Sequence, residues 1–485
     1  MIAAAVELAH VHTPLLAIVA PLAGAGVCVM LGGARFGWVA ALLAVAACAV
    51  FSWDAALRAL TSGEARFAVE GAALFADGVG LYAAALLSSV ALLALIGAAP
   101  ARSDYEMRAA PFALALMLVA LAGLIGALHA RDLVGVFIAL EAAWLALVGL
   151  IAMSPERGGL NGALRMLGAG GVSAALFVLG AALLQRASGS FDLPAIADEL
   201  IERSDAAALG AGLVLISVAL KAGLAPLHEW VGAAFARAGV AAGVVLGAVS
   251  VVGAVAVLVR LAAYFGASPA LGEGVSIALA ALGGVSVVIG SLQAIGARSL
   301  PRLAAYAGIA QGGGVLLCVA LGSPAGFAAA LVQLTAFAAT AVALLGGAAT
   351  GAVRALESLD GLGRRAPIAG AAIMAGAISL MGAPLTLGFL GRWRLVEAGV
   401  GAGWWWAAGA VIFTSLAGVF YGGRLIERLY FRRAAEVSLS RRDPWRAAYA
   451  PMLLAAIFVI ALGVAPKALL DVADAAAAQM TGLAP

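Results

Sequence analysis

Residues 208–230 read ALGAGLVLISVALKAGLAPLHEW and hold the features that decide the fold. The stretch is apolar and long enough to cross a bilayer as a helix, which takes about 20 residues. Pro226 breaks that helix, because proline deletes one backbone hydrogen bond and clashes with the carbonyl four residues earlier. Lys221 lies in the same run, where a charge is costly and so points to function. The stretch therefore predicts a broken membrane-spanning helix that carries an ionisable group.

The composition of the whole chain agrees with a membrane protein. Of its 485 residues, 65% are hydrophobic and 11% are charged, which excludes a water-soluble protein and leaves no room for a soluble catalytic domain. The net charge of +3, with basic residues scattered through the loops, does not favour nucleic acid. Cys28, Cys48 and Cys318 lie in separate apolar runs and are predicted to be buried. We expect no cofactor and no metal site.

The apolar runs predict an all-α polytopic membrane protein of about fourteen transmembrane helices. Backbone polar groups in hydrocarbon must pair within their own segment, and a barrel would instead show alternating runs of about ten residues. The predicted spans are 14–31, 36–52, 73–98, 109–128, 133–153, 163–185, 208–227, 239–264, 274–296, 301–321, 325–349, 367–396, 404–428 and 449–469.

Basic residues in the loops predict the orientation. They gather in loops that follow odd-numbered spans, and by the positive-inside rule these loops face the cytoplasm. The residues are Arg35, Arg102, Arg108, Arg157, Arg165, Arg237, Arg298, Arg302, Arg354, Arg364, Arg365 and seven more from Arg424 to Arg446. Both termini then lie on the non-cytoplasmic side, of what we expect to be a bacterial inner membrane. The acidic loop 186–207 becomes an external connection that can hold a short surface helix.

Two ionisable groups inside the spans are candidates for ion transport. Glu141 lies about 13 Å into the fifth span, at 1.5 Å per helical residue, and Lys221 lies at a similar depth in the seventh. The chain has 28 Lys and Arg, of which only Lys221 and Lys467 are lysines. A buried lysine can release its proton and an arginine cannot. We predict a Glu141/Lys221 pair, which serves either a proton relay or helix register.

A second broken span is predicted around Pro384, in the sequence Gly382-Ala-Pro384. Pro226 and Pro384 should free the carbonyls of Ala222 and Leu380. Spans seven and twelve correspond if spans 4–8 and 9–13 are repeats, and five-helix repeats have inverted topology, with paired broken helices marking a transport path. The predicted units are 1–108 (helices 1–3), 109–264 (first repeat), 265–428 (inverted repeat) and 429–485 (a loop and helix 14).

At these residues the sequence resembles the antiporter-like subunits of respiratory complex I, which are shared with Mrp-type cation/proton antiporters and energy-converting membrane hydrogenases. The resemblance covers roughly residues 128–400 and is closest to the shorter complex I-type subunits. Its most specific element is Lys221 followed by Pro226-Leu-His228-Glu-Trp230. Supporting motifs are Glu141, Leu300-Pro-Arg302-Leu-Ala-Ala-Tyr306, Gly361-Leu-Gly-Arg-Arg365, Gly382-Ala-Pro384 and Gly388-Phe-Leu-Gly391.

The resemblance implies a proton path from the Glu141/Lys221 pair through a central lysine in helix eight to helices ten and twelve. This sequence departs from that pattern at three positions. Val251, after Ser250, occupies the position of the central lysine, Gln311 that of a helix-ten histidine, and Arg392 that of the last titrating group. Gln311, Gln333, Thr335, water or a neighbouring subunit would have to bridge the gap. His228 can take in protons, or simply cap the broken helix.

Three further features are predicted to be structural. Asp77 should start a helix, His129 with Arg131 and Asp132 should form a solvated external turn, and the tryptophans 404–406 should anchor the chain at the membrane interface.

Three functions follow from these features. The first is a proton-translocating (or sodium-translocating) subunit of a multi-subunit complex of the NADH-quinone oxidoreductase or hydrogenase type. The second is a Mrp-type antiporter or ion-uptake subunit, and the third is a scaffold that does not pump. The expected partners are other membrane subunits, the lipid bilayer and protons or Na⁺. The sequence offers no catalytic centre, so any enzyme activity would belong to the complex.

Overall fold

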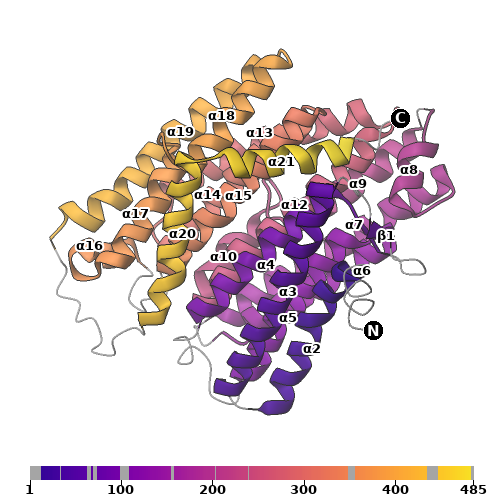
Figure 1. Ribbon diagram of the computed structural model, residues 1–485. Helices are drawn as coiled ribbons and strands as arrows, with labels where there is room; N and C mark the ends of the chain where they lie inside the picture. Colours follow the sequence, from indigo (N-terminus) through magenta and orange to yellow (C-terminus); the bar gives the residue numbers. More distant parts are fainter. Residues whose placement is uncertain are drawn as a thin grey trace.

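The computed structural model describes residues 12–32, 34–62, 67–68, 74–98, 109–154, 158–202, 204–238, 240–347, 355–433 and 446–481. Within these ranges the protein is a bundle of α-helices with one pair of two-residue strands (Figure 1). Of the basic residues used to predict orientation, Arg102, Arg108, Arg157, Arg354, Arg441 and Arg442 lie outside the described residues.

The first half of the chain contains the following elements: α2 (Thr13–Leu31), α3 (Ala34–Ser62), β1 (Phe67–Ala68), β2 (Phe75–Ala76), α4 (Gly78–Ala98), α5 (Ala110–His129), α6 (Leu133–Ala152), α7 (Gly159–Ser188), α8 (Leu193–Glu199), α9 (Asp205–Lys221), α10 (Glu229–Arg237), α11 (Val240–Val244), the π-helical η2 (Val245–Val251) and α12 (Val252–Ala267). The rest contains α13 (Gly272–Gly296), α14 (Leu300–Ala320), α15 (Pro324–Gly347), η4 (Leu356–Leu359), α16 (Leu362–Arg365), α17 (Pro367–Met381), α18 (Leu387–Gly401), α19 (Trp405–Ile426), η5 (Glu427–Phe431), α20 (Arg446–Val464) and α21 (Lys467–Thr481).

The described helices confirm an all-α membrane protein. Eleven of them are long and apolar enough to cross a bilayer, or up to twelve if the bent pair α20–α21 counts as one span. The prediction of about fourteen included two interrupted spans, and here the structure has pairs of shorter helices, α9 with α10 and α17 with α18. The two numbers therefore differ because of the breaks at Pro226 and Pro384.

The C-terminal end departs from the predicted span 449–469. Helix α20 ends at Val464, Pro466 follows, and α21 leaves at an angle of 83° to it. Proline cannot continue the ladder of a helix but suits the start of the next one. In Figure 1, α21 crosses the bundle sideways, and it packs against α4 and α15. This lateral helix differs from the single span that the sequence predicts at 449–469.

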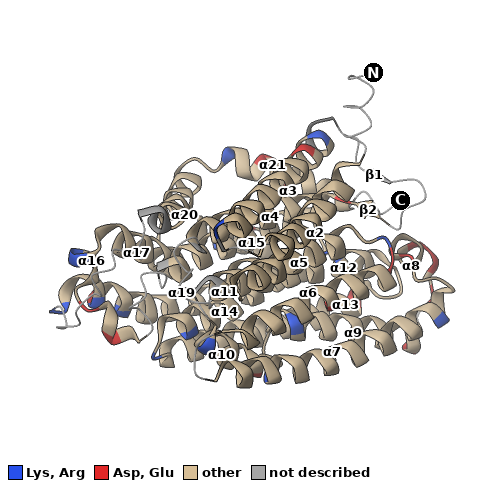
Figure 2. Cartoon of the chain, turned by 90° about the horizontal axis from the view of Figure 1, so that it is seen from below, with Lys and Arg blue, Asp and Glu red and all other residues tan. Residues whose placement is uncertain are grey.

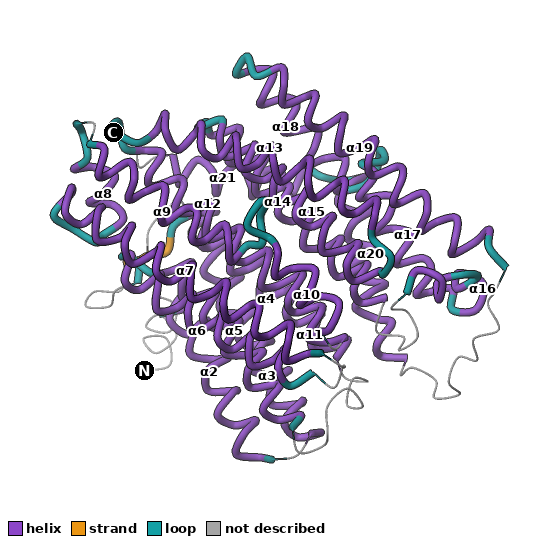
Figure 3. Tube along the Cα trace, turned by 180° about the vertical axis from the view of Figure 1, so that it is seen from behind, coloured by secondary structure: helices purple, strands orange, loops and turns teal. Residues whose placement is uncertain are grey.

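The core of the bundle is built around two spans with long, fully buried stretches. One apolar window of 18 residues within each of the spans Ala242–Ala267 and Pro324–Gly346 is entirely buried. Helices α17–α19 lie at one end of the molecule and α6–α9 at the other, with α14 and α15 between them (Figure 3). Close packing depends on small residues: a Cβ added to Gly180 would lie 2.7 Å from the carbonyl oxygen of Gly210 on the neighbouring α9.

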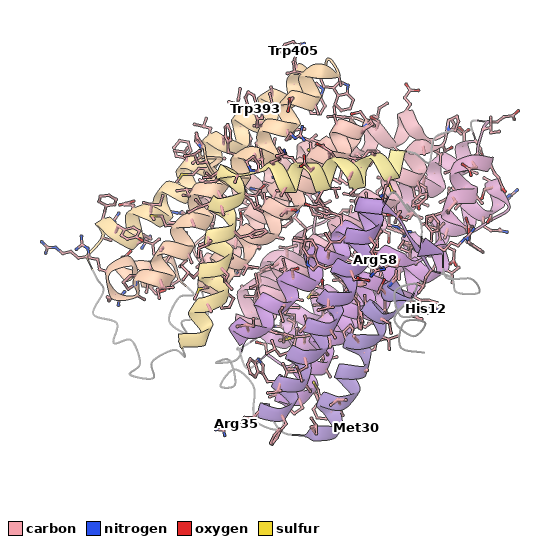
Figure 4. All side chains as sticks on the ribbon, in the orientation of Figure 1. His12, Met30, Arg35, Arg58, Trp393 and Trp405 are labelled. Atoms are coloured by element: carbon pink, nitrogen blue, oxygen red, sulfur yellow. The ribbon has the colours of Figure 1, made fainter. Side chains whose placement is uncertain are left out.

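Charged residues lie mainly at the helix ends and in the connections (Figure 2). The short helix α8 confirms the predicted surface helix in the acidic loop. Trp405, which is 69% exposed, lies at the end of α18 and α19 (Figure 4), and its role as an interfacial anchor stays a prediction. The three cysteines are free and buried, as predicted.

The prediction for His129 was wrong. Its side chain is buried at the end of α5, where Nδ1 lies 2.9 Å from the carbonyl oxygen of Ile125. Its neighbours do form the expected turn: Asp132 caps α6 by accepting from the Gly135 amide at 2.8 Å, and Arg131 pairs with Asp192. A single histidine between an apolar helix and a polar turn gives no sequence signal of the side on which it packs.

Candidate ion-translocation site

The break after α9 is a tight, hydrogen-bonded helix end. The Gly223 amide donates to the Leu220 carbonyl at 3.1 Å, and the Leu224 amide reaches back to the Ala219 carbonyl at 3.0 Å. Gly223 has a φ of 66°, a left-handed conformation that glycine adopts without strain. Helix α10 begins three residues after Pro226, at Glu229. The predicted interruption of this span is therefore present, and Lys221 is the last residue of the first half-helix.

Lys221 is paired with Glu141. The Lys221 Nζ lies 2.9 Å from Glu141 Oε1, and the lysine side chain is 3% exposed while the glutamate side chain is 20% exposed. Nζ also lies 4.7 Å from the centre of the Trp144 ring, one helical turn after Glu141. The ring face and the carboxylate both favour the charged lysine in a site that excludes most water. The structure thus joins the two groups that the sequence singled out.

Side chains from neighbouring helices hold the break in shape. The indole of Trp230 on α10 donates at 2.9 Å to the Leu220 carbonyl, which also accepts from the Gly223 amide, and its ring meets Trp144 edge to face at 5.0 Å. On α13, Ser286 Oγ accepts from the Ala225 amide at 3.1 Å. The carbonyl that Trp230 contacts is that of Leu220. The carbonyl that Pro226 was predicted to free is a different one, that of Ala222.

The break after α17 has the same backbone pattern. The Gly382 amide donates to Ser379 at 3.0 Å and the Ala383 amide to Ile378 at 3.0 Å, and Gly382 has a φ of 71°. Helix α18 then starts after Thr386, whose hydroxyl accepts from the Phe389 amide. Here the freed carbonyl is that of Leu380, as predicted, and Arg392 Nη2 of α18 donates to it at 2.6 Å.

Arg392 and Gln311 line one cavity in the second half of the chain. The cavity has about 20 Å³ open to the centre of a water-sized sphere, enough for one small guest. Gln333 of α15 also lines it and donates a hydrogen bond to the Gln311 side chain. Thr335, a further polar candidate, faces elsewhere and lies 2.5 Å from the Tyr82 hydroxyl.

An apolar region surrounds Val251, the position that the resemblance assigns to a central lysine. A smaller cavity of about 10 Å³ lies there, lined by residues with no polar side-chain atom. The lining residues are Ala222, Gly223, Val231, Phe235, Gly247, Val251, Ala304, Ala305, Gly308, Ile309, Phe337, Ala341 and Leu345. Val251 ends the π-helical turn η2, a distortion that often marks functional sites. The cavity touches the first break at Ala222 and Gly223 and offers no side-chain polar group that could hold a water.

His228 lies apart from these groups. It precedes α10 as a half-buried residue, and in the part of the chain that the structure describes no ion pair or hydrogen bond joins it to Lys221 or Glu141. Glu141 and Lys221 thus form one site, Gln311 and Arg392 form a second, and His228 belongs to neither.

One buried charge pair escaped the sequence analysis. Arg260 of α12 and Asp77 before α4 are 1% and 3% exposed, and Arg260 Nε lies 2.5 Å from Asp77 Oδ2. Tyr264 donates to the same carboxylate at 3.0 Å, and Arg260 also donates to the carbonyl of Ala130 at 2.8 Å. Asp77 does start its helix, accepting from the Gly80 amide. Arg260 lies inside the predicted span 239–264, so an arginine within an apolar run was the available signal.

The fold and the two broken spans define an antiporter-like membrane subunit. Two solved structures support this class: a chain of respiratory complex I from Thermus thermophilus, with a TM-score of 0.79, 26% identity and coverage of 94% of this chain and 98% of that one, and a chain of the Mrp complex from Dietzia sp., with a TM-score of 0.84 and coverage of 98% of both. The second is 21% identical and so shows similarity of fold alone.

Residues 130–418 match the family described as NADH:quinone oxidoreductase/Mrp antiporter, TM, and this chain belongs to that family. Among its relatives is NADH-quinone oxidoreductase subunit N 1 of Solidesulfovibrio magneticus, 34% identical over 283 residues, which are 57% of this chain. The alignment spans 60% of the length of that relative.

Proposed function

We propose that this chain is a proton-translocating subunit of a multi-subunit membrane complex, in which the Glu141/Lys221 pair couples a conformational or redox change to proton movement. The observation that carries the proposal is the 2.9 Å ion pair at the end of a broken span. Breaks in the backbone at membrane depth are tolerated where they line a path or are buried in protein. The names of its relatives, NADH-quinone oxidoreductase subunits, support the same type of complex.

The pair has the properties of a switch. With Glu141 in contact, the charged lysine is stabilised; when the carboxylate moves away, a lysine that is 97% buried loses that stabilisation and tends to release its proton. A fifth of the Glu141 side chain lies at the surface of the chain, so a neighbouring subunit or a change in helix position can reach it. Two separate groups can therefore alternate between paired and unpaired states.

We further propose that His228 supplies protons from the cytoplasmic side and that Gln311 and Arg392 belong to the far half of the path. Arg392 would act there as a fixed positive charge, because arginine keeps its proton. The matching hydrogen bonds at Gly223 and Gly382 support inverted repeats at 109–264 and 265–428. Both termini would then face the non-cytoplasmic side.

A specific observation favours a second function, a scaffold without its own path. The apolar surroundings of Val251 interrupt the polar groups between Lys221 and Gln311. If this gap stays dry, protons cannot cross from one half to the other, and the Glu141/Lys221 pair would serve only to fix helix register.

Proton transport in proteoliposomes that hold the purified native assembly decides between the two functions. We expect Lys221→Ala and Glu141→Ala to abolish pumping with the assembly intact. Lys467→Ala is the matched control, since Lys467 is the chain's other lysine and lies exposed at the start of α21. Pumping at the wild-type rate in both Lys221→Ala and Glu141→Ala would reject the transport role and leave the scaffold. Replacing external H⁺ gradients with Na⁺ gradients identifies the ion.

A further inference from the structure

Arg392 is a buried cation without a carboxylate. Its side chain is 6% exposed, Nη2 donates to the Leu380 carbonyl, and Nη1 has no hydrogen-bond partner. Among the described residues no Asp or Glu forms an ion pair with it. Arg394, two residues later, instead pairs with Asp474 at 3.0 Å and with Glu397 at 3.7 Å. The acidic groups of this region are therefore engaged by a surface arginine.

The other two buried cations among the described residues each have a carboxylate beside them. Lys221 has Glu141 at 2.9 Å and Arg260 has Asp77 at 2.5 Å. A buried charge that keeps its proton and lacks a counter-charge is strongly unfavourable in a medium of low dielectric constant. One carbonyl dipole satisfies one donor but neutralises no charge. Arg392 therefore requires an anion that the described residues do not supply.

The cavity beside Arg392 suits such an anion. Gln311 and Tyr421 line it together with Arg392, and each carries a group that can donate a hydrogen bond. Two other polar lining residues are already engaged: the Thr414 hydroxyl donates to the Val411 carbonyl, and the Gln333 amide donates to Gln311. The remaining lining residues, such as Val287 and Leu395, are mainly apolar. The space of about 20 Å³ accepts one water-sized guest and excludes a tetrahedral oxyanion with its four oxygens.

We propose that this cavity binds a single halide ion, chloride under ordinary conditions, between the Arg392 guanidinium and the neutral donors of α14 and α19. The ion compensates the arginine charge at the second break as Glu141 compensates Lys221 at the first. Gly382 belongs to the site because any side chain there would displace the arginine: an added Cβ would lie 2.2 Å from Nη1.

The test measures thermal unfolding of the purified native assembly while chloride replaces gluconate at constant ionic strength. We expect the unfolding midpoint of the wild type to rise with chloride and to saturate, because a ligand of the folded state stabilises it. Arg392→Gln should lose this chloride-dependent shift. Arg394→Gln, which removes an arginine two residues away, should keep the full shift.

A second measurement covers the case in which Arg392→Gln fails to assemble. Crystals of the wild-type assembly grown in bromide should show an anomalous scattering peak within hydrogen-bonding distance of the Arg392 guanidinium. Water alone in the cavity, a carboxylate from a neighbouring subunit there, or an equal chloride response in Arg392→Gln would each overturn the proposal. None of these results depends on whether the chain transports protons.

Discussion

The two broken spans have the same backbone hydrogen-bond pattern but differ in the side chains at the break. At Gly223 and at Gly382 the chain leaves its helix through the same pair of backward hydrogen bonds, and in each case a side chain of the second half-helix donates to a backbone carbonyl at the end of the first. At the first break the cap is the neutral Trp230, so Lys221 is left to pair with Glu141. At the second the cation itself is the cap. The two breaks thus share a backbone geometry, and their side chains differ in whether the cation has a carboxylate partner.

The largest effect is expected when the lysine of the first break is replaced by arginine, the cation of the second break. We predict that Lys221→Arg preserves the pair with Glu141 and the assembly but lowers proton pumping by more than about tenfold, because a guanidinium does not release its proton at physiological pH. Proton flux in proteoliposomes at matched subunit content measures it. Lys467→Arg is the control. Pumping at the wild-type rate in Lys221→Arg would mean that lysine titration plays no part.

A smaller effect should follow from glycine replacement at the two breaks. Gly223→Ala and Gly382→Ala force a Cβ into a left-handed residue at a cost of about 1–2 kcal/mol. The added atom would also lie 2.5 Å from Val231 Cγ2 in the first case and 2.2 Å from Arg392 Nη1 in the second. We expect a lower unfolding temperature for both variants.

The controls for that experiment are Gly212→Ala and Gly401→Ala, on the half-helices α9 and α18, where an added Cβ meets no atom within 4 Å. A large drop at one break and none at the other would show that the two backbones are not equivalent in stability.

The smallest effect is expected from a change at Trp230, the neutral side chain that caps the first break. Trp230→Phe keeps an aromatic ring near Trp144 but removes the hydrogen bond to the Leu220 carbonyl, worth about 1 kcal/mol. We expect a slight loss of stability with proton pumping retained. Chemical denaturation of the assembly and the flux assay measure the two quantities. If pumping is lost as fully as in Lys221→Arg, Trp230 belongs to the path itself.

The sequence predicted much of the first site because its parts lie in recognisable local patterns. Lysine is so rare in this chain that Lys221 stood out, and Glu141 was the ionisable group at matching depth. Arg260 was missed although it lies inside a predicted span, since its partner Asp77 is 183 residues away and was interpreted only as a residue that starts a helix. Such a pair is visible only when the helices are packed.

By itself, the sequence determined that this is a helical membrane protein with two breaks, because hydrocarbon demands long apolar helices and the prolines at 226 and 384 each remove a backbone hydrogen bond. It also placed an ionisable lysine at the first break. Only the tertiary structure decided which charges are paired: Lys221 reaches Glu141, Arg260 reaches Asp77, and Arg392 reaches a carbonyl beside a cavity. Coulombic pairing depends on distances of a few ångströms between helices, and no local pattern along the chain contains those distances.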